Sequence, residues 1–346
     1  MIEKFLVSRH EQHYQAWPDL ALTASGKLIC AFAQCKHHGD RSFARFVTVE
    51  SSDRGRSWTA PRVLVETSEQ GWWNCPRIVR LRDGRMVIIG DHVVAGEGSP
   101  DDNLTNWLWF SGDEGATWSG PHPTPIRGIV PDKILELPGG RWLLAAQHRE
   151  PGFGYLVQRV WWSDDRGATW QGPSIVGRQE GLHLCEASLL PLPDGGVVAF
   201  MRENSGQGWD GFKSFSADGG ETWEGPYPTV LCGCHRPVAG WLQSGRCLVT
   251  YRFLQGGRGG WGRGTQNFFG ALMPPETVAA RERKEQWARI LPLDFDHHRH
   301  SDIGYSGWVQ FEDGEIVVVT YLLDDWDRGQ IRGYRFRESE FGEFAD

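Results

Sequence analysis

An octapeptide that occurs four times constrains the fold of this chain more than any other feature. It has the form S-x-D-x-G-x-S/T-W and occupies residues 51–58, 111–118, 163–170 and 216–223. The aspartate can accept hydrogen bonds from backbone N–H groups of a tight turn, and the glycine allows a backbone shape that a side chain resists. The tryptophan adds a large apolar surface. Every position has a role in folding, so the repeat, an Asp box, predicts a hairpin turn rather than a binding site.

A second repeat gives the number of structural units. Six segments of alternating apolar residues each contain a turn that ends in glycine, at Gly26, Gly84, Gly140, Gly195, Gly245 and Gly314. Such S-G, D-G and G-G turns between alternating runs indicate β-hairpins. The first four are followed by an Asp box, so each unit reads as four antiparallel strands. The sequence therefore predicts an all-β, six-bladed β-propeller that fills residues 1–346 as a single domain.

Two segments depart from the simple repeat. The stretch PPETVAARERKEQWAR, residues 274–289, begins with proline and predicts a short exposed helical insertion. Near the N-terminus, EKFLVSR is expected to pair beside IRGYRF, residues 331–336, and so close the ring.

Composition limits the partners and the compartment. The 346 residues carry 36 Lys and Arg against 44 Asp and Glu, which argues against a nucleic-acid partner. No apolar run approaches the roughly 18 residues of a membrane span, so no membrane partner is expected. The seven cysteines match no disulfide framework or zinc pattern, and neither does HHRHSD at 297–302 with His37 and His38. We therefore expect a cytoplasmic protein without a cofactor or metal.

Polar residues recur where the inner strands of a propeller begin, and these ends meet at one mouth. The strand starts contribute Trp17, Asp19, Arg77, Asp132, Glu186, His235, Arg236, Asp302 and Tyr305. The connections that return to the mouth contribute His38, Asp40, Arg41, Arg202, Asn204 and Arg252. Converging polar groups in one concavity are typical of a ligand site.

The residue types at this mouth favour a small carbohydrate, acidic sugars included. Arginines can clamp a carboxylate with paired hydrogen bonds, and carboxylates can act as general acid and base. Aromatic faces for sugar rings come from the tryptophans near the mouth, Trp17, Trp72, Trp73, Trp209 and Trp261.

The boxes and the blade pattern resemble the sialidase superfamily from about residue 14 to 336. CEASLLPLPDGGVVAFMRE is similar to the sialidase strands that carry the glutamate partner of the nucleophile, here Glu186, and one carboxylate-binding arginine, here Arg202. GYSGWVQFEDGEIVVVTY resembles the strand of the tyrosine nucleophile, which implies Tyr305. CKHHGDRSF stands where the acid/base aspartate lies, which implies Asp40.

This resemblance implies an exo-acting glycoside hydrolase with a retaining mechanism. A tyrosine with a pKa near 10 is a poor nucleophile at neutral pH, so Glu186 would take its proton. Sialidases with a tyrosine nucleophile are known exceptions to the two-carboxylate scheme.

One departure from the family leaves alternatives open. Sialidases begin the first blade with an R-I-P type motif whose arginine binds the carboxylate, but here the segment is AWPDL, with Trp17, Pro18 and Asp19 instead. Arg77, Arg236 or Arg252 would have to substitute for the missing cation. A glycosidase for another sugar, a uronate polysaccharide lyase using His235, Tyr305 and Arg236, and a non-catalytic carbohydrate-binding propeller therefore stay open.

Overall fold

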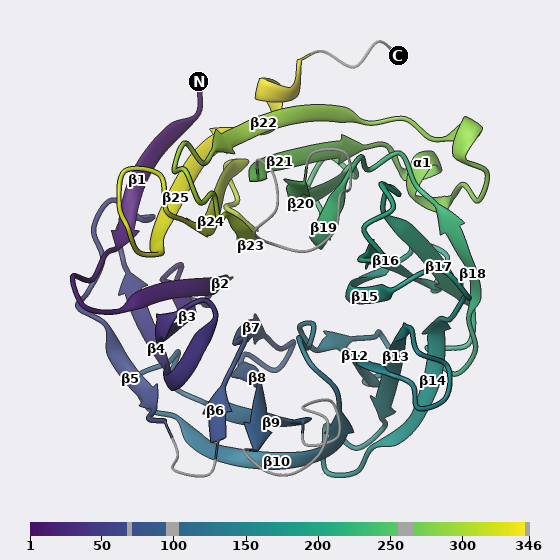
Figure 1. Cartoon of the computed structure of the whole chain (residues 1–346), viewed down its shortest axis with the longest axis horizontal. Coiled ribbons are helices and arrows are strands. Elements are labelled where there is room, and N and C mark those ends of the chain that lie inside the picture. Colours follow the sequence, from purple (N-terminus) through teal and green to yellow (C-terminus); the bar gives the residue numbers. More distant parts are fainter. Residues whose placement is uncertain (68–70, 95–103, 255–265, 343–346) are drawn as a thin grey trace.

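Six antiparallel sheets surround a central axis in the computed structural model of the chain (Figure 1). The structure describes residues 1–67, 71–94, 104–254 and 266–342. All six hairpin glycines have φ between 82° and 91°, a region that glycine adopts without steric penalty. The predicted all-β, six-bladed propeller is confirmed.

The blades follow one another along the chain. Blade one contains β2 (Tyr14–Leu22), β3 (Leu28–His37), β4 (Asp40–Ser51) and β5 (Arg62–Val65). Blade two contains β7 (Arg77–Arg80), β8 (Met86–Val94), β9 (Leu104–Ser111) and β10 (Ser119–Arg127), and β6 (Gly71–Trp73) also pairs with β8. Blade three contains β11 (Leu135–Glu136), β12 (Trp142–Arg149), β13 (Leu156–Ser163) and β14 (Gln171–Gly177).

The remaining three blades complete the circle. Blade four contains β15 (Leu184–Pro191), β16 (Val197–Glu203), β17 (Phe212–Ser216) and β18 (Glu224–Pro228). Blade five contains β19 (Cys234–Trp241), β20 (Cys247–Leu254), β21 (Gln266–Met273) and β22 (Arg289–Phe295). Blade six contains β23 (Gly304–Gln310), β24 (Glu315–Leu322), β25 (Gln330–Arg337) and, as its outer strand, β1 (Glu3–Ser8).

The ring is closed by strands from opposite ends of the sequence. β1 lies beside β25 (Figure 1) and pairs with it antiparallel, with Phe5 opposite Gly333. The expected pairing of the N-terminal segment with residues 331–336 is therefore confirmed.

The Asp boxes form the turns that the sequence predicts. In the first box, Asp53 accepts hydrogen bonds from the Ser57 backbone N–H at 2.9 Å and from the Ser51 hydroxyl at 2.8 Å. The other three boxes repeat this pattern. The Ser25 N–H, in the first hairpin turn, donates to Glu114 of the second box at 2.9 Å. Hairpin turns and boxes therefore lie together, at the end of the blades away from the mouth.

The predicted helical insertion at 274–289 is present and mostly exposed, but helix occupies only part of it. The segment forms only α1 (Pro275–Ala279) and a 3-10 turn, η3 (Arg283–Glu285), and a further 3-10 turn, η4 (Glu338–Phe341), follows blade six. Val278 is buried in the core of blades four and five. Arg283 holds the segment by donating to the Thr229 carbonyl oxygen at 3.0 Å. No helix in the described ranges has the length and apolar character to cross a membrane.

A backbone irregularity at the inner strands positions the site. At or just before five of the six inner strands, a residue other than glycine has a left-handed backbone: Trp17 (φ 56°), Val130 (φ 50°), Glu186 (φ 49°), Arg236 (φ 54°) and Tyr305 (φ 48°). The strand registers shift at four of these points, which marks β-bulges. Each such residue costs about 1–2 kcal/mol of backbone strain, and bulges often direct side chains into sites.

The contact between the first and last blades tests this arrangement. A Cβ atom added to Gly307 on β23 would lie 2.1 Å from Asp19 Oδ1 and 2.3 Å from the Leu20 nitrogen. We expect Gly307→Ala to lower the free energy of unfolding by at least about 1–3 kcal/mol, measured by urea unfolding. Gly139→Ala is the control, because a Cβ there meets nothing within 4 Å. Equal unfolding midpoints for the two variants would contradict the close packing of blades one and six.

Candidate active site

A pocket of about 190 Å³ lies among the inner strands and the connections that return to the mouth. Its charged and aromatic lining comes from blades one, four, five and six: Trp17, His38, Arg41, Glu186, Arg202, Arg252 and Tyr305. Three of these residues, Trp17, Glu186 and Tyr305, have the left-handed backbone described above. The bulges thus bring side chains from separate blades into one cavity.

A chain of hydrogen bonds crosses the pocket. The Tyr305 hydroxyl donates to Glu186 Oε1. Arg202 Nη1 donates to both carboxylate oxygens of Glu186, at 2.9 and 3.0 Å, and its Nη2 donates to Asn204 Oδ1 at 2.6 Å. Tyr305, Glu186 and Arg202 are all buried, with at most 7% of their surface exposed. The hydrogen bonds fix a phenol against an ionised carboxylate.

The two central groups have opposite pKa shifts. Burial, and next the charge of Glu186, raise the pKa of Tyr305 well above 10. Burial alone would also raise the pKa of Glu186, but Arg202 and Arg252 outweigh it and hold that pKa below its usual value. In the free protein, Tyr305 is therefore a protonated donor and Glu186 an ionised acceptor.

Arg252 is a buried cation with few partners. It is 1% exposed, and its Nε and Nη2 have no hydrogen-bond partner among the described residues. Its Nη1 reaches only Gln266 Oε1, at 3.5 Å. A buried charge without full hydrogen bonding is unfavourable. Arg252 is therefore suited to receive an anion.

A third arginine comes from blade one. The Arg41 guanidinium lies 4.3 Å from the centre of the Trp17 ring, and its Nε donates to the His38 carbonyl oxygen at 3.4 Å. The pocket lining thus contains three arginines, Arg41, Arg202 and Arg252, against the single carboxylate of Glu186. This excess of positive charge favours an anionic ligand.

His38 forms a second polar unit at the pocket wall. Its Nδ1 lies 2.5 Å from Asp302 Oδ2, and the hydroxyl groups of Tyr14 and Tyr321 also donate to Asp302. Burial opposes ionisation of Asp302, but His38 and these hydrogen bonds outweigh it and hold its pKa at about 2. Burial, with further effects from Arg41 and Arg252, lowers the pKa of His38 despite Asp302.

Arg77, Arg236 and Asp19 were expected to bind substrate, but none of them lines this pocket. All three are fully buried. Arg77 donates to the carbonyl oxygens of Pro18 and Ser306, at 3.3 and 2.9 Å. Asp19 accepts the Ile78 N–H at 2.9 Å and pairs with Arg77 at 3.4 Å. These bonds join neighbouring blades, so the structure gives these side chains a structural role.

Arg236 has the same role on the other side of the axis. It donates to the carbonyl oxygens of Ala187 at 3.1 Å and Pro131 at 3.0 Å. Asp132, also an expected substrate contact, accepts the Leu189 N–H at 2.7 Å and faces a different cavity, of about 290 Å³. His235 is 1% exposed and does not line the pocket, and its ring nitrogens have no hydrogen-bond partner in the described ranges.

Asp40 also lies outside the pocket, contrary to its expected role as the acid/base. Its side chain is 42% exposed and bonds Ser42 at 2.6 Å and Lys36 at 3.0 Å. The hydrogen bonds of Ser42 and Lys36 lower the pKa of Asp40 to about 2. A carboxyl group this acidic is a poor proton donor near neutral pH.

The tryptophans expected at the mouth lie in different surroundings, and the histidines form no metal site among the described residues. Trp17 lines the pocket, Trp73 is buried in the core, and Trp209 is 51% exposed. Trp261 lies outside the described residues. In the part of the chain that the structure describes, no group of three His, Cys, Asp or Glu residues could hold a metal ion.

Some pocket residues escaped the sequence interpretation. Gln147 lines the pocket and accepts the Glu186 N–H at 3.0 Å. Tyr14 and Tyr321, which hold Asp302, stand in apolar strands and look like core residues. His38 and Arg41 were placed at the mouth without a role. For Gln147, the sequence feature that could have identified it is its place at the mouth end of the strand after Gly140.

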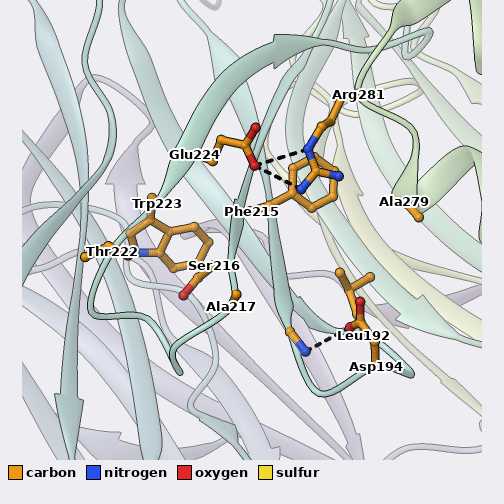
Figure 2. Close-up of a pocket in the computed structure, with 11 residues that line it drawn as sticks. Leu192, Asp194, Phe215, Ser216, Ala217, Thr222, Trp223, Glu224, Ala279 and Arg281 are labelled. Carbon is orange, nitrogen blue, oxygen red and sulfur yellow. Dashed lines mark hydrogen bonds and ion pairs between the residues drawn. The ribbon is translucent and has the colours of Figure 1, made fainter.

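A larger cavity, of about 350 Å³, lies beside the box of blade four and the segment after α1 (Figure 2). Arg281 pairs there with Glu224 at 2.9 Å and stacks on Phe215, and Asp194 accepts the Gly196 N–H. Its charged groups are satisfied by one another or by the backbone. Volume alone therefore does not make it the better candidate.

Two buried arginines provide a test of this division. Arg236→Met would leave carbonyl oxygens of three residues without their donor, so we expect it to lower the free energy of unfolding by about 2–4 kcal/mol. Arg252→Met removes a buried charge with few partners, so we expect unchanged or increased stability. Urea unfolding of both variants measures the difference. A larger loss for Arg252→Met than for Arg236→Met would reverse the assignment.

Comparisons with known proteins agree with this architecture. The sequence profile of the BNR repeat-like domain family matches residues 26–318. None of the curated proteins matches the chain. A protein of unknown function from Dyadobacter fermentans has a similar structure, with TM-score 0.79, 21% identity, and coverage of 97% of this chain and 99% of that one.

Two enzymes have the same fold at lower identity. The intramolecular trans-sialidase of Ruminococcus gnavus, solved with oseltamivir carboxylate, has TM-score 0.68 and 15% identity, with 96% of each chain covered. The α-L-arabinanase of Penicillium chrysogenum, solved with arabinobiose, has TM-score 0.66 and 13% identity, with 96% of this chain and 97% of that one covered. By its sequence match over most of its length and its six-bladed architecture, the chain belongs to the BNR repeat-like domain family.

Proposed function

We propose that the chain is an exo-acting, sialidase-like glycoside hydrolase that acts on an acidic sugar and uses Tyr305 as its nucleophile. The observation that carries this proposal is the hydrogen-bonded series Tyr305–Glu186–Arg202 inside the pocket. A phenol needs a base to become nucleophilic at neutral pH. Glu186 is the group in contact with the Tyr305 hydroxyl, and Arg202 fixes its orientation.

The charge of the pocket supports an acidic sugar. Arg41, Arg202 and Arg252 line a small cavity. The Nε and Nη2 donors of Arg252 have no acceptor among the described residues. A sugar carboxylate bound there would form charge-assisted hydrogen bonds. Arg41, from the turn region of blade one, supplies a further cation, which lies over the Trp17 ring.

Substrate binding would also activate the base. Arg202 and Arg252 hold the pKa of Glu186 down in the free protein. A carboxylate on Arg252 would cancel part of this positive field, so the pKa of Glu186 would rise. Glu186 would then accept the Tyr305 proton more readily when an anionic substrate is present.

The reaction would proceed in two displacements. Tyr305 Oη attacks the anomeric carbon, the phenol proton moves to Glu186, and the bond to the leaving oxygen breaks as that oxygen takes a proton from an acid/base group. Water then gives a proton to this group and displaces the tyrosine, which regains its own proton from Glu186, so the anomeric configuration is retained. The lyase set of His235, Tyr305 and Arg236 is not favoured, because neither His235 nor Arg236 lines the pocket.

A panel of 4-nitrophenyl sialosides, glucuronides, glucosides and rhamnosides tests the activity. We expect release of 4-nitrophenol from an acidic glycoside, and loss of at least about a thousandfold in kcat/KM for Tyr305→Phe with an unchanged melting temperature. Tyr227→Phe is the matched control, because this hydroxyl bonds Glu224 away from the pocket.

Three results would count against this function. Full activity of Tyr305→Phe would remove the tyrosine nucleophile, and an unsaturated uronate formed from a 4-linked uronate oligosaccharide would indicate elimination. Hydrolysis of the glucoside in preference to the glucuronide would contradict the acidic substrate.

A further inference from the structure

We propose that His38 is the acid/base residue of this site and that Asp302 is the positioning residue that orients it. This inference rests on the proposed function, because it names the group that exchanges a proton with the leaving group and with water. The proposal rests on three positions. His38 lines the pocket, Asp302 bonds to its ring, and Asp40 lies outside the pocket.

His38 shares the pocket with Tyr305 and Glu186 and is 5% exposed. Its Nδ1 faces Asp302 Oδ2 at 2.5 Å. Asp302 is ionised and can only accept, so Nδ1 carries the hydrogen of this bond. The bond fixes the ring tautomer and assigns proton exchange with a substrate to Nε2.

Asp302 is held more firmly than a simple core aspartate requires. Tyr14 from blade one and Tyr321 from blade six both donate to its carboxylate. Its own N–H donates to Asp296 at 2.9 Å. The imidazole orientation is therefore set by two blades at once, as expected for a group that must meet a reacting atom.

The same turn contains the alternative acid, and the two residues differ in their surroundings. Asp40 is bonded to Lys36 and Ser42 at the surface, whereas His38 lines the pocket. Of the three groups at the β3–β4 turn that could transfer a proton, His37, His38 and Asp40, only His38 lines the cavity that holds Tyr305.

The charges around His38 predict how a bound substrate would change its pKa. Asp302 faces it from blade six, Arg41 from blade one and Arg252 from blade five, together with the neutral phenols of Tyr14 and Tyr321. Burial and the two arginines keep the imidazole neutral in the free protein. An anionic sugar among these arginines would raise the pKa of His38, so substrate and proton would bind together.

The proton balance of the two steps is complete. In the first step, protonated His38 gives its Nε2 proton to the glycosidic oxygen while the bond from that oxygen to the anomeric carbon breaks. In the second step, water attacks the anomeric carbon and gives a proton to Nε2, which restores the protonated imidazole.

The sign of the pH dependence follows from the first step. The protonated form is required, so kcat/KM should fall as the pH rises through the pKa of His38, which lies below 6.5 in the free protein. Because the bound anion raises that pKa, the corresponding fall in kcat should lie at higher pH.

His38→Asn is the test, because asparagine can keep the donor to Asp302 and lacks Nε2. The probes are the methyl and 4-nitrophenyl glycosides of N-acetylneuraminic acid and of glucuronic acid. A methanol leaving group needs a proton and 4-nitrophenolate does not. We expect kcat/KM to fall at least about a hundredfold on the methyl glycoside and less than about tenfold on the 4-nitrophenyl glycoside. His37→Asn, one residue away, should change neither.

The outcomes separate this inference from the function on which it rests. Equal losses on both kinds of glycoside, or none, would overturn the role of His38 while the hydrolase stands. Failure of the unchanged protein to cleave any of the four probes would count against the hydrolase itself. As a second variant, Asp302→Asn should shift the fall of kcat/KM to lower pH, because it removes the charge that favours protonated His38. An unshifted profile in active protein would overturn the positioning role.

Discussion

The propeller depends on hydrogen bonds that pass from one blade to the next at the inner-strand bulges. At three of the five left-handed positions, the polar side chain two residues later accepts a backbone N–H of the following blade. Asp19 accepts from Ile78 at 2.9 Å, and Asp132 accepts from Leu189 at 2.7 Å. Ser188 likewise accepts from Ala239 at 3.0 Å. Together with the bonds of Arg77 and Arg236 to carbonyl oxygens of other blades, these hydrogen bonds tie the inner strands to one another.

The same bonds make the strained backbone tolerable. Left-handed residues persist only where surrounding structure determines them, and here Arg77 and Arg236 also bind carbonyl oxygens beside the bulges. Buried arginines therefore have two different roles. Arg77 and Arg236 bond neighbouring blades to one another, whereas Arg202 and Arg252 line the pocket.

Sequence patterns predicted the fold well because its signals are local. The boxes and hairpin glycines each specify a turn, and six turns specify six blades. They also brought Tyr305, Glu186, Arg202, Arg252 and Trp17 to one mouth, where the structure places them together. The patterns could not separate Arg236 from Arg252, or Asp40 from His38, because one residue of bulge or turn decides which side chain faces the axis.

Ring closure has a consequence for how the molecule is made. Glu3 and Arg335, partners in blade six, are 332 residues apart in sequence. During synthesis, β1 emerges first and yet has no sheet to join until β25 exists. Contacts of such separation form late, so blade six can be completed only after the other five blades have been translated. β1, the first strand in the sequence, is therefore the last strand to pair with its sheet.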